Sequence, residues 1–331
     1  MKTKTFFLIA ALAAAVAINA QQISVVAPNG ITHIYTDLNL AIQGAETGST
    51  VYLSGGGFQV NDTTKIKKKL TIIGIGHRPD NDNADGNTSV SGNFWFEGGS
   101  DNSSVMGLFL SGDVNIGTAD NAVNNFLLRY CNINSVQVKN GNCQAIIINQ
   151  NYLRNISTCG NAPLTVSNNI MCGVNSMNGG IIEHNIILNN SASSYCYMYY
   201  MINNSQIRNN INFYHNCGSY ITQCNNTLFT NNMVVNGFSS LSFGENCYQS
   251  SLEDAFDETV FNISPNCNYS LKAGCAGKGK ATDGTDIGIY GGTGFSPTAL
   301  PPIPRITDKR GIAEQTDENG YLKIQIQVKA Q

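Results

Sequence analysis

The stretch Ile148-Asn149-Gln150-Asn151-Tyr152 is the first of five segments that share one pattern: an apolar residue, two polar residues, an asparagine and another apolar residue. The other four are Val166–Ile170, Ile182–Ile186, Ile207–Ile211 and Phe229–Met233. Their asparagines follow one another at intervals of 18, 16, 25 and 22 residues. These intervals are too short for a β-α-β unit of about 30 residues and too irregular for a leucine-rich repeat. They predict one coil of a parallel β-helix per repeat, with turns of variable length.

Asparagine has a physical reason to recur at this position. Where two short strands meet at a sharp bend, one residue must leave the β region, and Asn tolerates the left-handed region better than other non-glycine residues. Its amide can also hydrogen-bond to an asparagine of the next coil, about 4.8 Å away. The pattern therefore predicts an internal asparagine ladder of Asn151, Asn169, Asn185, Asn210 and Asn232. Asn132 is a candidate for one more rung, with a register that is open by one residue.

Both ends of the repeat region carry signals that predict caps. The segment Thr36–Ile42 predicts an amphipathic helix with an N-terminal capping residue, lying across the first coil near residues 37 to 44. Such a helix would cover apolar surface and unpaired strand edges. Gly48–Leu53 and Leu70–Gly76 are expected as strands, and Gly284–Gly292 as a closing strand bounded by turns. In all, about nine to eleven coils are expected.

The expected helix, the Gly-Ser-Thr-Val-Tyr-Leu and Leu-Thr-Ile-Ile-Gly-Ile-Gly strands and the asparagine ladder together resemble the pectate-lyase-like superfamily. The segment Asp283–Gly292 resembles the C-terminal coil of right-handed β-helix repeat proteins common in gut and soil Bacteroidetes. The resemblance spans roughly residues 23 to 295 and implies an all-β, right-handed parallel β-helix (solenoid). It implies no single activity, because that superfamily includes polysaccharide lyases, glycoside hydrolases, carbohydrate esterases, phage tailspikes and non-catalytic surface proteins.

Residues 1–20 have the three-part layout of a secretory signal peptide: two lysines, the apolar run Phe6–Ala17, and the small residue Ala20 before a polar chain. The apolar run is shorter than the roughly 20 residues that a membrane-spanning helix needs. We therefore expect cleavage after Ala20, no transmembrane span in the mature chain, and a secreted, periplasmic or cell-surface location.

The region after the signal peptide divides into two parts. Residues 21–295 are the expected β-helix domain, and 296–331 form an expected proline-rich linker with a C-terminal strand tail. The alternation from Leu322 to Val328 predicts a half-buried strand, which would pack on the helix or join another subunit in an oligomer.

The composition bears on possible partners. The net charge of −3 offers no basic field for nucleic acid. The ten cysteines contain no Cys-x-x-Cys pair, so a zinc site is not expected. They fall at roughly one per repeat in the central region, which favours buried thiols, with one or two disulfides between neighbouring coils as the alternative.

The central stack is poor in acids. Between Asn121 and Ser250 only Glu183 and Glu245 carry carboxylates. A glycosidase needs two carboxylates facing one bond, and a calcium-dependent lyase needs several acids near a basic residue. We therefore favour a non-catalytic polysaccharide-binding or cell-surface protein; the alternative is a polysaccharide lyase or another carbohydrate-active enzyme. For such an enzyme the candidate catalytic residues are Tyr199, Arg208, Tyr214 and His215.

Glycan-binding candidates come from two places in the repeats. Tyr195, Tyr197 and Tyr199 would share one face by alternation; facing outward they could stack on sugar rings, and facing inward they would belong to the core. Glu183 and Arg208 occupy matching positions in adjacent repeats, which predicts an ion pair between coils, with a proton-transfer site that includes His184 as the alternative. Both are also candidate glycan ligands. Trp95, between Phe94 and Phe96, is expected in core or cap packing.

One segment partly matches a calcium loop. In Asn81-Asp82-Asn83-Ala84-Asp85-Gly86, the oxygen-bearing residues Asn81, Asn83 and Asp85 alternate and glycine stands sixth. The twelfth position is Gly92, where a bidentate glutamate would be expected. Calcium is therefore the candidate metal, with a surface turn rich in Asp, Asn and Gly as the alternative. No cofactor is required by the pattern.

Overall fold

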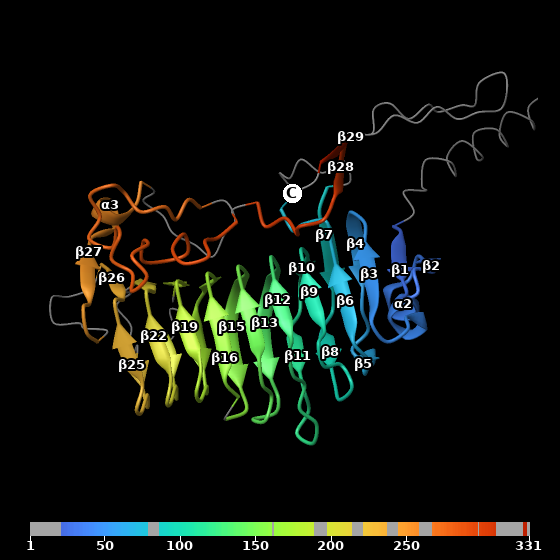
Figure 1. Ribbon diagram of the computed structural model, residues 1–331, viewed down its shortest axis with the longest axis horizontal. Coiled ribbons are helices and arrows are strands. Elements are labelled where there is room, and N and C mark those ends of the chain that lie inside the picture. Colours follow the sequence, from blue (N-terminus) through green and yellow to red (C-terminus); the bar gives the residue numbers. More distant parts are fainter. Residues whose placement is uncertain are drawn as a thin grey trace, which may run out of the picture.

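The chain forms a right-handed parallel β-helix, the fold predicted from the repeat (Figure 1). The computed structural model describes residues 21–78, 86–160, 162–188, 197–213, 221–236, 244–257, 267–296, 298–308 and 327–329. In this part of the chain the helices are α2 (Leu38–Gly44) and α3 (Leu252–Ala255). Neither has the length and apolar character that a bilayer crossing demands.

The strands stack into three faces, with one strand of each face added per coil. The first face contains β3 (Ser49–Leu53), β6 (Leu70–Ile73), β9 (Ser104–Met106), β12 (Leu127–Arg129), β14 (Ile146–Asn149), β16 (Leu164–Ser167), β19 (Ile181–Glu183), β22 (Gln206–Arg208) and β25 (Leu228–Thr230). These nine parallel strands span eight turns, against the nine to eleven coils expected. At the N-terminal end, the antiparallel strands β1 (Ile23–Val26) and β2 (Thr32–Tyr35) extend this face.

The second and third faces are joined by two long strands, β13 (Asn132–Val138) and β15 (Tyr152–Thr158), which run through the corner between them. The second face also contains β4 (Gly56–Gln59), β7 (Thr88–Ser91), β10 (Phe109–Leu110), β17 (Ile170–Met171), β20 (Ile186–Leu188), β23 (Ile211–Phe213), β26 (Met233–Val235) and β27 (Tyr248–Ser250). The third face also contains β5 (Lys65–Ile66), β8 (Phe94–Phe96), β11 (Val114–Ile116), β18 (Gly173–Asn175), β21 (Tyr199–Tyr200) and β24 (Ile221–Thr222).

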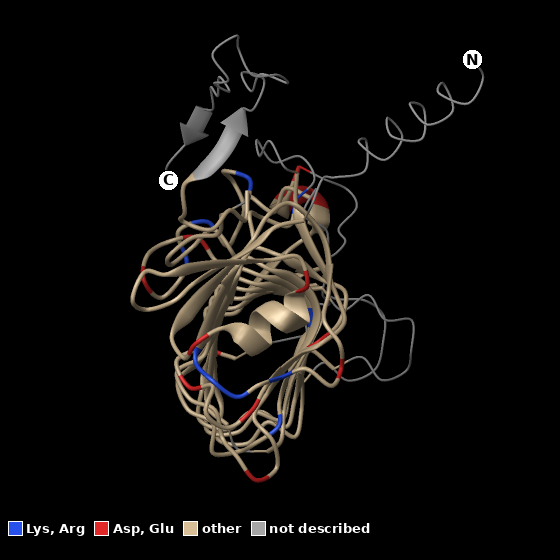
Figure 2. Cartoon of the chain, turned by 90° about the vertical axis from the view of Figure 1, so that its right-hand side faces the viewer, with Lys and Arg blue, Asp and Glu red and all other residues tan. Residues whose placement is uncertain are grey.

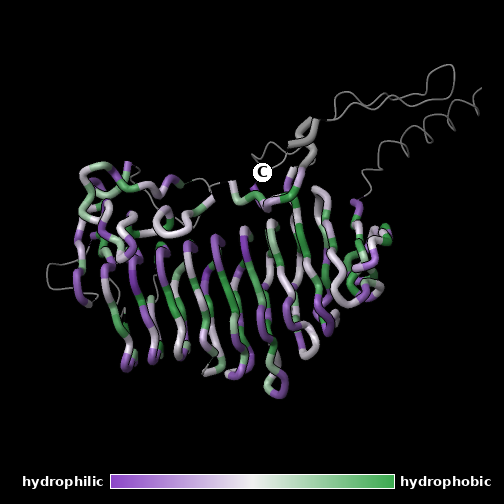
Figure 3. The backbone as a smooth tube through the Cα atoms, in the orientation of Figure 1, coloured by the Kyte–Doolittle hydropathy of each residue, from purple (hydrophilic) through white to green (hydrophobic). Residues whose placement is uncertain are grey.

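The interior is built from columns of apolar side chains. On the first face one inward residue of each strand from β3 to β22 stacks on its counterpart in the next coil, and all eight are 0% exposed: Val51, Ile72, Val105, Leu128, Ile148, Val166, Ile182 and Ile207. Figure 3 shows the result as hydrophobic stretches at similar heights in successive coils. Alternation along each short strand places such residues inward, so burial fixes the register of every coil.

The asparagine ladder forms at the corner between the first and second faces. The side-chain oxygen of Asn169 accepts from the backbone nitrogen of Asn151 at 2.9 Å and from its side-chain nitrogen at 3.0 Å. The same two bonds join the remaining rungs up to Asn232. Each side-chain nitrogen also donates to a carbonyl of the preceding coil. All five amides are 0% exposed, so this is a buried and mutually satisfied network.

The expected backbone role of these asparagines was wrong. The left-handed residue of each bend is the one before the ladder asparagine: Gln150, Asn168, His184, Asn209 and Asn231 have φ of 56°, 53°, 54°, 58° and 50°. The bend therefore divides its two tasks between successive residues. One residue takes the left-handed conformation, and the next turns its amide into the interior.

The register of Asn132 is also resolved. Tyr130 is the left-handed residue of its coil, with φ of 57°, so Cys131 occupies the ladder position and Asn132 pairs with Tyr152 in the sheet. The backbone nitrogen of Cys131 donates to the side-chain oxygen of Asn151 at 2.9 Å. Its thiol donates to the carbonyls of Val105 and Arg129, at 3.8 and 3.3 Å. Burial raises the pKa of this thiol to about 12, which keeps it a neutral donor.

Helix α2 covers the N-terminal end, as Figure 2 shows by viewing that end face-on. Asp37 caps the helix by accepting from the backbone nitrogen of Leu40 at 2.9 Å. Asn39 bonds to the backbone at the end of β4, the edge strand of the second face. Its side-chain nitrogen donates to the carbonyl of Gln59 at 3.3 Å, and its oxygen accepts from the backbone nitrogen of Asn61, just after the strand, at 2.9 Å. The amide thus takes the place of a neighbouring strand on an edge that could otherwise pair with another chain.

A return segment, residues 267–296 and 298–304, runs back along the outside of the coils (Figure 1). Its apolar residues and the outward side chains of the second face form a second core, which includes Tyr152, Ile186, Ile211, Ile287 and Phe295. The expected closing strand at Gly284–Gly292 was wrong, because these residues form turns of this segment. Part of the expected linker also packs here: Ala299 is 0% and Leu300 4% exposed.

The left-handed residues of the bend hold the return segment. Asn168 donates to the carbonyls of Ile289 and Gly291 at 2.8 and 2.9 Å. Asn209 donates to the hydroxyl of Thr282 at 2.9 Å, and further bonds join Gln150 to Ser296 and Asn231 to Lys280. One corner therefore stabilises both the inner ladder and the outer segment.

The tail is described only in part. β28 (Arg305–Asp308) and β29 (Gln327–Lys329) pair antiparallel with each other. Most of the predicted strand Leu322–Val328 lies outside the described residues, so its docking and any oligomer through it stay predictions. The eight described cysteines are free thiols, whereas Cys196 and Cys217 lie outside the described part.

The ladder yields a stability prediction. Replacing Asn185 with leucine removes the buried acceptor of Asn169, the donor to the buried carbonyl of Val166 and the donor to the partly buried carbonyl of Glu183. We expect the free energy of unfolding to fall by about 3 kcal/mol or more, measured by urea denaturation. Asn155→Leu, at an exposed position of β15, should change it by less than about 0.5 kcal/mol. Equal effects of the two substitutions would contradict a structural role for the ladder.

The edge cap yields a second prediction. In Asn39→Ala the edge of β4 loses the side chain that satisfies Asn61 and Gln59. We expect concentration-dependent self-association, measured by light scattering, and a loss of about 1–2 kcal/mol in stability. Gln43→Ala, on the exposed surface of the same helix, is the matched control and should leave the protein monodisperse to the same degree as the wild type. A monodisperse Asn39→Ala protein would show that the edge needs no cover.

Candidate functional site

The three faces differ in what they offer to a ligand. From β15 to β26 the second face packs its outward side chains against the return segment. The first and third faces are therefore the surfaces on which rows of outward side chains can meet a partner. Each such row presents one side chain per coil, about 4.8 Å apart.

The third face carries a row of aromatic, amide and hydroxyl side chains. In register from the N-terminal coil these are Lys65, Trp95, Asn115, Gln137, Ser157, Asn175, Tyr200 and Thr222. All except Asn115, which is 3% exposed, are partly accessible. Trp95 and Tyr200 are five coils apart, which corresponds to about 24 Å along the axis. We call this row the third-face row.

Aromatic rings stand near both ends of the third-face row. The Lys65 ammonium lies 3.6 Å from the centroid of the Trp95 ring, a cation–π contact. Tyr200 stacks on Tyr197, with the ring centroids 4.8 Å apart and the planes at 26°. Both tyrosines are partly exposed. The Trp95 and Tyr200 rings give the row partly accessible apolar surface; Tyr200 adds a polar tip, whereas the indole nitrogen of Trp95 is buried.

The middle of the row is tied into a polar network. Gln137 donates to the Asp113 carboxylate at 2.7 Å, and Asn134 donates to its other oxygen at 2.8 Å. Lys139 donates to the Gln137 side-chain oxygen. These bonds fix the rotamer of Gln137. Asp113 contributes one carboxylate and Lys139 one ammonium, so the charges of this network balance.

The sequence candidates Glu183 and Arg208 lie on the first face instead. They are register partners in β19 and β22, and Arg208 Nε lies 2.9 Å from Glu183 Oε2, which confirms the predicted ion pair. Glu245 lies three strands from Glu183, through Arg208 and Thr230, or about 14 Å away. A glycosidase pair needs about 5–9.5 Å, so these two acids do not form one.

At Tyr199 the structure favours the core alternative for the tyrosine run. Tyr199 is 0% exposed and donates to the side-chain oxygen of Asn212 at 2.8 Å, so it offers no ring to a sugar. Burial also raises its pKa well above the usual range, which makes it unsuited to proton abstraction near neutral pH. Tyr197 precedes β21, so strand alternation does not apply to it, and it pairs with Tyr200. Tyr195 lies outside the described residues.

His184 takes part in packing of the return segment. Its ring is 4% accessible; Nε2 lies 3.2 Å from an Asp283 carboxylate oxygen and 3.1 Å from the Asn209 side-chain nitrogen, and Nδ1 lies 3.3 Å from the Gly288 carbonyl. Burial of Asp283 raises its pKa, but hydrogen bonds from Thr285 and the electrostatic effect of His184 outweigh burial, so the pKa of Asp283 is lowered. The ring is enclosed by the chain itself, so this cluster holds the return segment in place.

Other sequence candidates cannot be placed. Tyr214 and His215 lie outside the described residues, as do Asn81, Asn83 and Asp85 of the calcium-loop match. Within the described ranges no group of three or more His, Cys, Asp or Glu side chains is arranged to hold a metal ion.

Sequence reasoning missed the outward position of Trp95. β8 buries Phe94 and Phe96 at 0% exposure and turns Trp95 between them toward the outside. A strand at Phe94–Phe96 would turn the middle residue away from the other two, but all three residues are aromatic, so the sequence did not show which side faces outward. The register that runs from Trp95 through Asn115 to the partly accessible Gln137 supplies that mark.

Comparison with known proteins gives no family. No protein-family model matches the chain, and no curated protein matches it significantly.

The ion pair of the first face gives a prediction. The Arg208 and Glu183 side chains are 31% and 25% accessible, so solvent screens their attraction. We expect Glu183→Gln to lower the free energy of unfolding by less than about 1 kcal/mol, and the difference from the wild type to vanish near about 1 M salt. Urea denaturation at low and high salt measures both. A loss that persists in high salt would assign Glu183 a role other than this pair.

Proposed function

We propose that the protein is an exported, non-catalytic β-helix that binds a polysaccharide along its third face. The observation that carries the proposal is the third-face row, in which Trp95 and Tyr200 flank amide and hydroxyl side chains in register. Aromatic rings cover the apolar faces of sugars, and amides can donate to and accept from hydroxyl groups. A polymer laid along the axis would meet the same spacing at every coil.

The arrangement of the described acids supports binding rather than cleavage. Glu183 is neutralised by Arg208, and Glu245 lies too far from it to share a glycosidic bond. The two carboxylate oxygens of Asp113 accept hydrogen bonds from Asn134 and Gln137. The second candidate function is a polysaccharide lyase of the pectate-lyase-like superfamily; of its two described candidates, Arg208 is accessible and Tyr199 is buried.

Export and lineage belong to the same proposal. The apolar segment before Ala20 supports a cleaved signal peptide and a secreted, periplasmic or cell-surface location. The β-helix and its ladder support membership of the pectate-lyase-like superfamily in a Bacteroidetes-type secreted protein. The proposal needs no cofactor, and calcium at the Asn81–Gly86 loop is a proposed addition to be tested by titration.

The experiment uses the chain's single tryptophan. Trp95 is the only tryptophan, so its emission reports ligand at one end of the row. We expect a polysaccharide from a panel of neutral and acidic polymers to change this emission and to retard the protein in polysaccharide-containing native gels. Tyr200→Ala should weaken the binding about fivefold, because it removes one stacking platform.

Controls separate binding from turnover. Tyr52→Ala removes a tyrosine that is 37% exposed on the first face and should bind like the wild type. Assays of new reducing ends and of unsaturated products should both stay at background. Turnover that Arg208→Ala abolishes would overturn the non-catalytic proposal, and equal retardation of Tyr200→Ala and wild type would remove the third face from it.

A further inference from the structure

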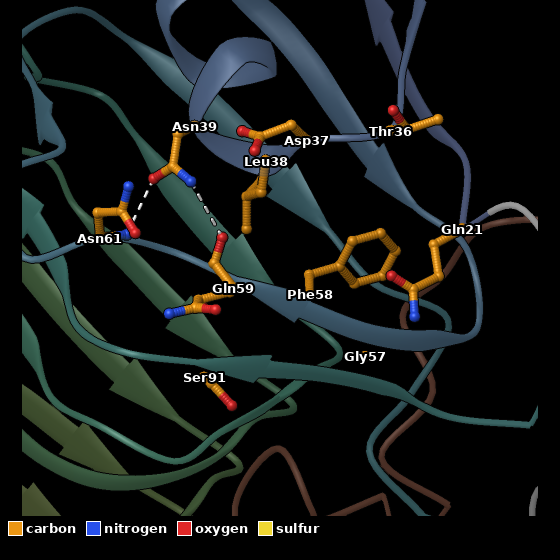
Figure 4. A pocket seen from close by; sticks show the side chains of 10 residues that line it. All are labelled: Gln21, Thr36, Asp37, Leu38, Asn39, Gly57, Phe58, Gln59, Asn61 and Ser91. Atoms are coloured by element: carbon orange, nitrogen blue, oxygen red, sulfur yellow. Dashed lines mark hydrogen bonds between the residues drawn. The ribbon is translucent and has the colours of Figure 1, made fainter.

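A pocket of about 530 Å³ opens at the N-terminal end, between the start of α2 and strands β4 and β7 (Figure 4). This size lies within the range of about 300–1,000 Å³ typical of small-ligand sites. The pocket is separate from the third-face row, because its walls come from the capping helix and the second face.

The rim of the pocket carries polar side chains that the fold does not use. Gln59 and Ser91 are register partners on β4 and β7, and both are exposed. Gln21 and Thr36 stand on the opposite wall. Within the described part of the chain none of these four side chains forms a hydrogen bond. Asn39 differs, since its amide is occupied by the edge of β4.

The floor of the pocket is apolar. Phe58 and Leu38 line it and are 5% and 2% exposed. A ring of amides and hydroxyls above an apolar floor matches a pyranose, which carries hydroxyl groups at its edge and C–H bonds on its faces. Amide side chains suit vicinal hydroxyls because one group can donate and accept at once.

The charge of the pocket selects among sugars. Asp37 is the one ionisable residue of its lining. The backbone N–H of Leu40 bonds to Oδ1 and lowers the pKa of Asp37, so the group is a carboxylate near neutral pH. Asp37 is exposed, so its carboxylate can also accept from a ligand hydroxyl, a charge-assisted bond. A uronate in the same place would meet like charge without a cation in the lining to offset it.

We propose that the pocket formed by Gln21, Thr36, Asp37, Gln59 and Ser91 over Phe58 binds one neutral sugar residue. The site is a second carbohydrate site, independent of whether the third face binds a polymer. Its place at the end of the solenoid gives it access to a chain terminus or a free saccharide, whereas the third-face row suits the middle of a polymer.

The test uses the full chain, in which Gln21 is an internal residue and adds no α-ammonium to the pocket, and named probes. D-glucose, D-galactose, D-mannose, D-xylose, N-acetyl-D-glucosamine and D-galacturonate are compared by saturation-transfer NMR and calorimetry. We expect at least one neutral sugar to bind and galacturonate not to bind. Gln59→Ala and Ser91→Ala should each weaken the neutral sugar by about fivefold, since each removes hydrogen bonds at an exposed position that the fold does not need.

Two further variants make the outcome specific. Asp37→Asn keeps a good helix-capping residue and removes the charge, so it should admit galacturonate. Tyr200→Ala, on the third face, should bind the neutral sugar like the wild type while losing polymer affinity. The proposal is overturned if no neutral sugar binds, if Gln59→Ala and Ser91→Ala bind as the wild type does, or if Tyr200→Ala abolishes the monosaccharide signal.

Discussion

The bend between the first and second faces is the constraint on which the rest of the structure depends. Each ladder asparagine is fully buried, and Asn169, Asn185 and Asn210 both accept from the preceding rung and donate to the following one. A buried amide that lost either partner would cost roughly 1–3 kcal/mol, so every coil must present its bend at the same height. The distance along the chain is free to vary, and successive rungs are 16 to 25 residues apart.

The same bend determines the path of the C-terminal segment. The left-handed residue before each rung turns its side chain outward, where Asn168, Asn209 and His184 meet residues 282–291. Glycine is needed where this segment approaches the coils: a Cβ on Gly288 would lie 2.4 Å from an Ile211 side-chain atom, and its φ is 95°. The glycine-rich stretch that the sequence suggested as a closing strand therefore serves close packing on the outside of the second face.

Sequence reasoning succeeded where burial repeats from coil to coil. The ladder residues, the helix capped by Asp37 and the strands β3 and β6 were all predictable, since each combines a local signal with a periodic apolar pattern. It failed where the outcome depends on contacts between distant segments. Tyr199 could be placed in the core only by knowing that β21 begins there, and His184 could be removed from the catalytic candidates only by knowing that residues 283–288 cover it.

Stacking also explains why acids are scarce. In a parallel β-helix like residues face one another at about 4.8 Å, so a repeated carboxylate would repel its neighbours in a column. Amides avoid this repulsion and can bond along the column, which suits a chain with only 12% charged residues. A low acid content is therefore a property of the architecture and carries little functional information alone. The arrangement of the side chains is more informative: the accessible Glu183 is paired with Arg208, Asp113 is bonded to amides, and the rings at Trp95 and Tyr200 remain partly open to a ligand.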